Sequence, residues 1–212
     1  MPGIKEPSKP KAPKYSNLGM ALLGNILAEC LDLTYEQAVK ELALKPLEMF
    51  ETHTSVKKYD EARVAKGDSP NGKPAPHFAW ECMEPCGVWF STPRDIMIFL
   101  KAHLGHSGDE WKDALKLTTQ PVSDDSNNNI FGLGWVLEEN EQMGRISYHT
   151  GGIFGQHSVI ACALEKDIAI ALFSNRRERL WHNFFASHKI DELATDILLS
   201  LDEINATQTN IT

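Results

Sequence analysis

The chain has 212 residues, of which 42% are hydrophobic and 24% are charged. This length allows a domain with a substantial core, and this composition excludes a disordered or collagen-like chain. Lysine and arginine number 21 against 29 aspartates and glutamates, which gives a net charge of −8 and indicates no basic surface for nucleic acid. The apolar runs are far shorter than the roughly 20 residues that cross a bilayer, so no membrane span is expected.

Residues 1–14 contain four prolines and several lysines with almost nothing apolar, and we expect them to form an extended arm. No apolar run follows the lysines, so this segment lacks the pattern of a secretory signal peptide. The four cysteines of the chain are too few and too scattered for a disulfide scaffold. Cys82 and Cys86, with His77 nearby, lack the spacing and the second pair typical of zinc sites, so no metal is expected.

Two helices are predicted after the arm. Apolar residues recur at steps of three and four over 16–31, which indicates a helix with one buried face. Thr34 and Gln37 form a capping box for a second helix over 34–44, which cannot continue past Pro46.

Residues 51–86 have no sustained period and are rich in glycine and proline, which predicts a long loop region. Ser91 or Thr92 can cap a third helix, for which Pro93 suits the first position. A short amphipathic segment follows over 109–117, and the polar stretch 123–129 predicts a turn.

The second half of the chain is rich in β-branched and aromatic residues and predicts consecutive antiparallel strands. The strands are expected at 131–137, 145–149, 157–164 and 168–174. Residues 165–167 suit a hairpin connection, and helical spacing returns over 187–202. The fold class predicted is α+β. The expected parts are one domain over 15–204, with a helical region over 15–120, strands over 130–175 and a C-terminal helix over 187–202, and then a tail over 205–212.

Two short motifs could carry chemistry. Tyr15-Ser16-Asn17 stands where the first helix begins, and its simplest role is helix capping. The run 149–152, His-Thr-Gly-Gly, ends a predicted strand, and its glycines would let a backbone N–H approach a substrate oxygen. The simpler interpretation of the second motif is a turn. Each motif is weak by itself.

Together with three further blocks, these motifs resemble the serine β-lactamase-like superfamily, in particular class C β-lactamases and related esterases and D-amino-acid peptidases. The five blocks, in chain order, are 15–24 with 45–49, then 87–95, 131–135, 149–158 and 172–175. The resemblance covers most of the chain and implies the C-terminal part of the β-lactamase/transpeptidase-like fold. It also suggests a bacterial periplasmic or secreted setting, although no signal peptide is recognised.

The resemblance implies a serine acyl-hydrolase, in which a serine attacks an ester or amide carbonyl while a tyrosine and a lysine transfer protons. It implies no cofactor, and a small ester, amide or β-lactam-like molecule as ligand. Where the family often has lysine, this chain has a histidine, which favours esters or small amides over β-lactams. The implied roles are catalytic for Tyr15 and His149 and substrate-binding for Asn17, Thr150, Gly151 and Gly152, with the Gly152 N–H in an oxyanion hole.

The nucleophile of the family is the serine of an S-x-x-K motif upstream of the tyrosine motif, and no suitable serine is found here. Ser8 fits the spelling, but Pro10 inside its motif would cost a helix about 3 kcal/mol. Ser55 also fits, yet it follows the tyrosine motif in a polar segment that could not bury Lys58 and lower its pKa. We therefore judge both serines decoys and expect the isolated chain to be inactive.

The missing part of the family fold has a structural consequence. Apolar surface on the first helix and at the edge of the sheet should lack its partner, which predicts a homo-oligomer, strand exchange or a complementing N-terminal segment. The alternative to a hydrolase is a non-catalytic module that keeps the pocket for a ligand or partner.

Overall fold

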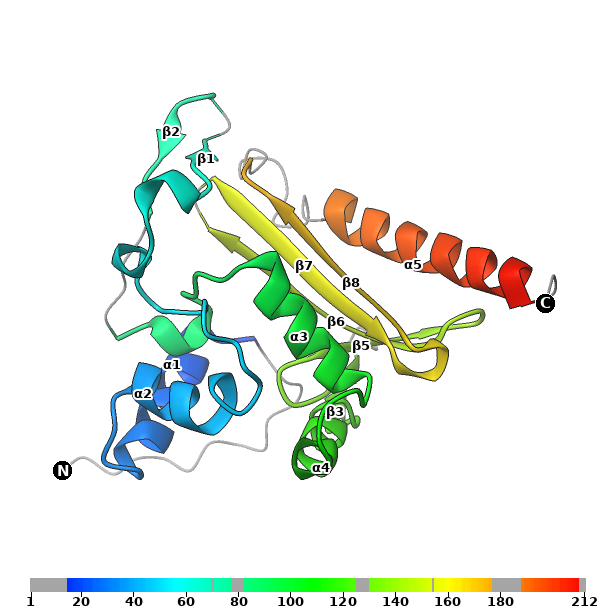
Figure 1. Ribbon diagram of the computed structural model, residues 1–212, viewed down its shortest axis with the longest axis horizontal. Coiled ribbons are helices and arrows are strands. Elements are labelled where there is room, and N and C mark those ends of the chain that lie inside the picture. Colours follow the sequence, from blue (N-terminus) through cyan, green and yellow to red (C-terminus); the bar gives the residue numbers. More distant parts are fainter. Residues whose placement is uncertain are drawn as a thin grey trace.

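The computed structural model describes residues 15–69, 71–77, 82–124, 130–153, 155–176 and 188–209. Its centre is a six-stranded antiparallel sheet in the order β3-β4-β5-β6-β7-β8. Helix α5 covers one face of this sheet and helix α3 the other, while α1 and α2 lie to one side (Figure 1). The predicted α+β class is confirmed. None of the helices in these ranges is long and apolar enough to cross a membrane.

The bounds of the elements are as follows. The helices are α1 (Asn17–Glu29), α2 (Tyr35–Val39), which continues as the π-helix η1 (Lys40–Leu44), α3 (Pro93–His103), α4 (Asp109–Thr118) and α5 (His188–Thr209). The 3₁₀ turns are η2 (Val56–Lys58), η3 (Glu61–Arg63), η4 (Glu84–Cys86) and η5 (Leu164–Lys166). The strands of the main sheet are β3 (Ser123–Asp124), β4 (Ile130–Phe131), β5 (Val136–Asn140), β6 (Gly144–Ile153), β7 (Gln156–Ala163) and β8 (Ile168–Ser174). A separate pair consists of β1 (Gly67–Asp68) and β2 (Pro74–Ala75).

The helix starts follow the capping residues of the sequence. The Ser16 side chain accepts a hydrogen bond from the Gly19 N–H, and Thr34 forms both halves of a capping box with Gln37. Thr92, rather than Ser91, caps α3. Each of these side chains satisfies a backbone N–H that the helix itself cannot pair.

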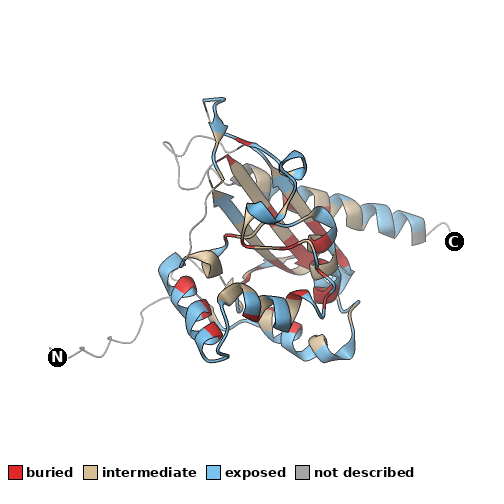
Figure 2. Ribbon diagram, turned by 60° about the vertical axis from the view of Figure 1, so that its left-hand side comes forward, coloured by how far each residue is buried: buried red, intermediate tan, exposed pale blue. Residues whose placement is uncertain are grey.

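The buried face of α1 is not the one that the apolar spacing predicts. Its buried residues are the small ones, Ala21, Gly24 and Ala28. The close contact is with η4, because a side chain at Gly24 would overlap the ring of Pro85. The large apolar residues of the predicted face are instead 49% to 71% exposed, which leaves most of α1 pale blue in Figure 2. These residues are Leu18, Leu22, Leu23, Ile26 and Leu27, and we call them the α1 apolar face.

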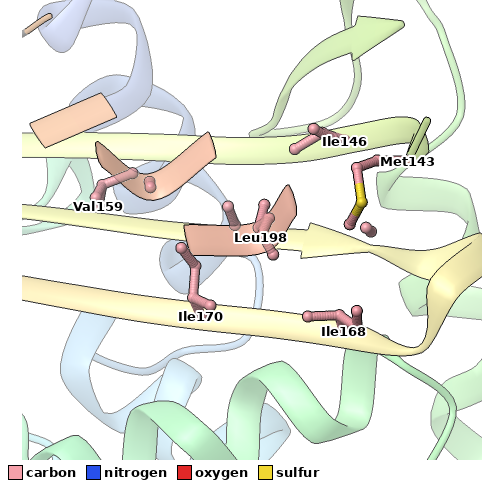
Figure 3. Close-up of a cluster of buried hydrophobic side chains, with 9 residues drawn as sticks. Met143, Ile146, Val159, Ile168, Ile170 and Leu198 are labelled. Carbon is pink, nitrogen blue, oxygen red and sulfur yellow. The ribbon is translucent and has the colours of Figure 1, made fainter. Parts of the chain in front are cut away.

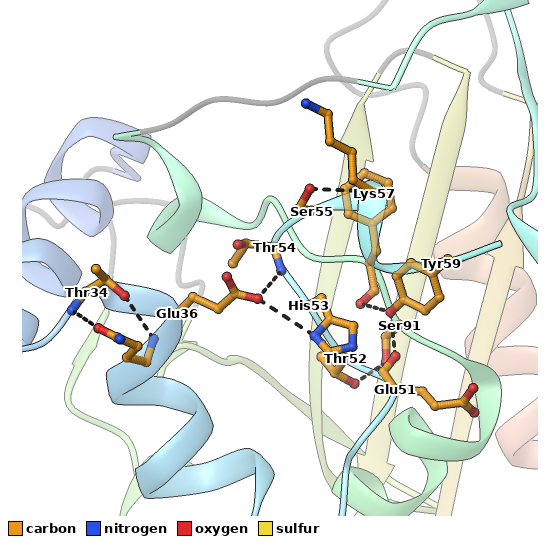
Figure 4. Close-up of polar contacts among 12 residues, drawn as sticks. Thr34, Glu36, Glu51, Thr52, His53, Thr54, Ser55, Lys57, Tyr59 and Ser91 are labelled. Carbon is orange, nitrogen blue, oxygen red and sulfur yellow. Dashed lines mark hydrogen bonds and ion pairs between the residues drawn. The ribbon is translucent and has the colours of Figure 1, made fainter. Parts of the chain in front are cut away.

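The long loop region after α2 is held by polar contacts rather than by regular structure (Figure 4). The buried Asp95 carboxylate, in the first turn of α3, accepts hydrogen bonds from the Glu51 N–H and the Thr52 hydroxyl, both at 2.8 Å. The Tyr59 hydroxyl donates to the Glu51 and Phe90 carbonyls, and burial together with the nearby Asp95 raises the pKa of Tyr59 to about 12. These contacts fix the loop against the start of α3.

Two strand predictions need correction. The predicted strand 131–137 is a hairpin, since the Gly132 N–H donates to the Trp135 carbonyl and Gly134 has a φ of +88°. This turn separates β4 from β5, and the left-handed backbone at position 134 suits glycine. The strand predicted to end at His149 continues through both glycines to Ile153, because it pairs with β7 over that whole length.

The α5 face of the sheet carries the larger of its two apolar cores (Figure 3). Leu198 of α5 packs on residues that alternate along β6, β7 and β8, such as Ile146, Val159 and Ile170. The helix also runs to Thr209, well past the expected end at 202 and into the expected tail. No proline or glycine occurs between 202 and 209 to end it.

Candidate functional site

The His-Thr-Gly-Gly run lies on a strand that is paired on one side. Strand β5 pairs with β6 only as far as Val136 opposite Tyr148, whereas β7 continues beside β6 as far as Ile153. Within the described chain, residues 149–153 therefore have β7 on one side and no strand on the other. We call this segment the open edge of β6. An open strand edge presents backbone N–H and C=O groups that can pair with an extended ligand.

The hairpin between β4 and β5 creates the open edge. Its turn, Gly132 to Trp135, directs the chain away from β6. Strand β5 therefore pairs with β6 up to Tyr148 but not at His149. The Leu133 N–H donates to the Thr118 carbonyl at the end of α4, which anchors the turn. Sequence reasoning missed this role, and the available signal was the spacing of two glycines, at 132 and 134, within a predicted strand.

The four predicted residues of the open edge do not share one face of the sheet. Residues on alternate positions of β6 point to opposite faces, so His149 and Gly151 lie on the α3 face and Thr150 and Gly152 on the α5 face. Gly151 and Gly152 are exposed. The Ser158 hydroxyl, across from Gly151, is 3.5 Å from the Gly151 carbonyl, at the long limit of a hydrogen bond. The two exposed glycines leave room for a ligand close to the backbone.

The surroundings of His149 favour its neutral form. Burial lowers the pKa of its imidazole, with a smaller opposing contribution from the Thr150 backbone. A neutral imidazole can donate or accept a hydrogen bond, but it provides no fixed positive charge to bind a carboxylate.

Tyr15 and Asn17 lie at the start of α1, where Ser16 is the capping residue. Tyr15 is 70% exposed, and its pKa is raised above the ordinary value, first by partial burial and second by the nearby Cys86 thiol. Asn17 is also exposed. In the described residues, no hydrogen bond joins Tyr15 to His149, so their joint action stays a prediction.

The structure assigns Ser55 a local role. Its hydroxyl accepts a hydrogen bond from the Lys57 N–H at 3.3 Å and caps η2, while Lys58 is exposed. This geometry provides no buried lysine to activate Ser55. Ser8 lies outside the described residues. Within the ranges given above, no group of three histidine, cysteine or acidic side chains could hold a metal ion.

The comparisons with known proteins agree on one family, the beta-lactamases. The beta-lactamase family model matches residues 6–195. Among curated proteins, beta-lactamase-like protein 2 of Dictyostelium discoideum is 38% identical over 95 residues, which are 41% of this chain and 16% of that protein. A human beta-lactamase-like 1 protein is 34% identical over 92 residues, covering 43% of this chain and 18% of its own length.

Solved structures show the same fold. A tyrosine-to-phenylalanine mutant of a class C beta-lactamase has a TM-score of 0.78 at 19% identity, over 89% of this chain and 58% of that one. A D-alanine carboxypeptidase from Burkholderia cenocepacia has a TM-score of 0.76 at 18% identity, over 89% and 61% of the two chains. The beta-lactamase from Sulfitobacter sp. EE-36 has a TM-score of 0.75 at 21% identity, over 92% and 62%. The chain thus spans about three fifths of these structures.

Proposed function

Because the chain belongs to the β-lactamase family, we propose that it contributes part of a serine acyl-hydrolase site at the open edge of β6. The observation that carries this proposal is that β5 ends opposite Tyr148, so that 149–153 can pair with an extended substrate. The exposed Gly151 and Gly152 let a substrate carbonyl approach the backbone closely.

In this proposal the Gly152 N–H donates to the carbonyl oxygen of the substrate. A serine oxygen attacks the carbonyl carbon, and its proton passes to a base, for which Tyr15 is the candidate. The Gly152 N–H then stabilises the oxyanion of the tetrahedral intermediate. The leaving alcohol or amine takes up the proton as its bond breaks, and water later releases the acyl group from the serine.

The serine is the part that we do not assign to this chain. We propose that it comes from a complementing segment that carries an S-x-x-K motif. The lysine of that motif would also provide what Tyr15 lacks, because a raised tyrosine pKa must be lowered by a nearby cation before the phenolate can act near neutral pH.

Small esters or amides are the proposed substrates. The solved relatives include beta-lactamases and a D-alanine carboxypeptidase, whose names denote cleavage of amide bonds. The neutral His149 in this chain binds a carboxylate less strongly than a charged lysine would, which disfavours β-lactams relative to uncharged esters.

The test is a titration of the isolated chain with N-acetyl-alanine methyl ester, read by amide chemical shifts. We expect shifts at 149–153, their loss in Gly151→Val, and their retention in Gly108→Val, a matched glycine with open space around it. Shifts confined to other residues, or none, would contradict the site.

The chemistry is tested separately with a fluorophosphonate probe. Removal of a catalytic serine typically costs about 10⁶ in turnover, so the isolated chain should show no adduct by intact mass. An adduct on Ser8 or Ser55 would show that we misjudged a decoy. Labelling in the native source, followed by capture of this chain, should recover a labelled serine within S-x-x-K. Ligand shifts without any such serine would favour the alternative, a non-catalytic binding module.

A further inference from the structure

The segment 65–68 crosses the end of the sheet and contacts the turn at which the open edge of β6 ends. We call this segment the strap. It leads from the loop region into β1, and β1 and β2 lie where β7 begins and β8 ends (Figure 1). The strap therefore joins the loop region to the turn between β6 and β7.

The closest contact of the strap is between two backbones. Gly67 of the strap and Gly155 of the turn are both buried. A side chain at Gly67 would overlap the Gly155 carbonyl group, and a side chain at Gly155 would overlap the backbone of Gly67 and Asp68. Gly155 also has a φ of +70°, a conformation that favours glycine. No side chain separates the two segments, so the position of the turn depends on that of the strap.

Two amide side chains hold consecutive carbonyl groups of the strap. The Gln156 Nε2 atom donates to the Ala65 carbonyl at 3.0 Å, and the Asn175 Nδ2 atom donates to the Lys66 carbonyl at 3.1 Å. The Asp68 N–H donates in turn to the Asn175 carbonyl at 2.8 Å. Gln156 begins β7 and Asn175 follows β8, so these bonds tie the strap to two neighbouring strands.

The open edge needs such support because it has a paired strand on one side only. Residues 149–153 pair with β7 and with no other strand of the described chain, and two of them are glycines. Glycine restricts the backbone least, so a single ladder of hydrogen bonds leaves this segment prone to local opening at its end. Gln156 pairs with Ile153 and therefore lies on the α3 face, together with His149. The strap thus holds the end of the open edge from the face that carries His149.

We infer that the strap is a positioning element for ligand binding at the open edge, and that Gln156 and Asn175 are its positioning residues. By holding the turn, the strap keeps the Gly152 N–H where the carbonyl oxygen of a ligand can accept from it. Groups of a binding site must be held within about 0.5 Å of the productive geometry, which a loose strand end cannot provide. The inference rests on the proposed function for the ligand, whereas the effect of the strap on the turn is measurable without one.

Amide hydrogen exchange of the free chain tests whether the strap holds the turn. Gln156→Ala and Asn175→Ala should each raise the exchange rates of the amides that pair β6 with β7 between 151 and 158, by about fivefold for one lost hydrogen bond. Gln142→Ala is the matched control, because its side-chain amide donates to Asp202 at the other end of the sheet. It should leave the rates in 151–158 unchanged. Unchanged rates in both strap variants would overturn the inference.

The titration with N-acetyl-alanine methyl ester tests the effect on binding. Gln156→Ala and the isosteric Gln156→Glu, whose carboxylate cannot donate to a carbonyl, should both weaken the affinity about fivefold, with shifts still at 149–153. Gln142→Ala should bind the ester as the unaltered chain does. Faster exchange with an unchanged affinity would overturn the positioning role and leave the proposed function intact. An unaltered chain that gives no shifts at 149–153 would contradict the proposed function, and the positioning role with it.

Discussion

The sheet with α5 and the helix α1 differ in how their apolar residues are used. On the α5 face, Leu198 is fully buried among residues from three strands. On α1, the leucines that give the helix its periodicity are half exposed or more, and the buried residues are alanine and glycine. Both helices show the same spacing of apolar residues in the sequence. The spacing of apolar residues therefore predicts which face of a helix is apolar, but not whether another element packs against that face.

A pair of leucine-to-alanine variants tests this difference between α5 and α1 most directly. Leu198→Ala should lower the free energy of unfolding by about 2–5 kcal/mol, since it leaves a cavity between α5 and the sheet. Leu23→Ala, at a residue that is 50% exposed, should cost less than about 1 kcal/mol. Urea denaturation followed by circular dichroism measures both. Equal losses would mean that α1 is covered in solution.

The attachment of the loop region to α3 sharpens the comparison, because there the buried group is polar. Asp95→Ala should cost about 1–3 kcal/mol, since the Glu51 N–H and the Thr52 hydroxyl both lose their acceptor. Asp113→Ala, at an exposed position in α4, should be close to neutral. The same urea titration compares them, and a neutral Asp95→Ala would show that the loop is held by other contacts.

The smallest expected effect is a pH dependence within the packed region. Burial between Phe99 and Trp135 lowers the pKa of His103, and burial also lowers that of His149. The unfolded chain then binds more protons than the folded one. Stability is therefore complete above about pH 6.5 and falls at lower pH, by at most about 1.4 kcal/mol per pH unit for each histidine.

Substitution of the two histidines tests whether they cause this pH dependence of stability. His103→Gln and His149→Gln should each reduce the loss of stability between pH 6.5 and 5, and the double variant should reduce it further. Thermal unfolding across this range is the measurement. An unchanged slope in the double variant would place the pH dependence on the carboxylates.

Local signals predicted the fold where a single residue determines the backbone. Thr92 and Pro93 predict the start of α3, and Thr34 with Gln37 predicts that of α2. The β-rich runs 157–164 and 168–174 predict β7 and β8 closely. In each of these cases the interaction that fixes the element lies within a few residues of it.

The rest depended on contacts between distant residues. Neither segment by itself indicates that Asp95 accepts a hydrogen bond from the Glu51 N–H in the loop region. The run 149–152 was identified as a motif, but its open edge depends on where β5 ends, and the hairpin that ends β5 was predicted as a strand. The positions of Tyr15 and Asn17 relative to β6 could not be deduced, since no local pattern links α1 to the sheet.

The shortness of β5 has a consequence for how this fold can diverge. The register of β5 with β6 would place Trp135 and Gly134 opposite His149 and Thr150 if the strand continued toward its start. The φ of +88° at Gly134 prevents this continuation. A relative with a β-branched residue at that position could lengthen β5 by two residues. The backbone of 149–150 would then pair with β5 within the sheet. One glycine thus decides whether this strand segment pairs internally or is left available to an incoming molecule.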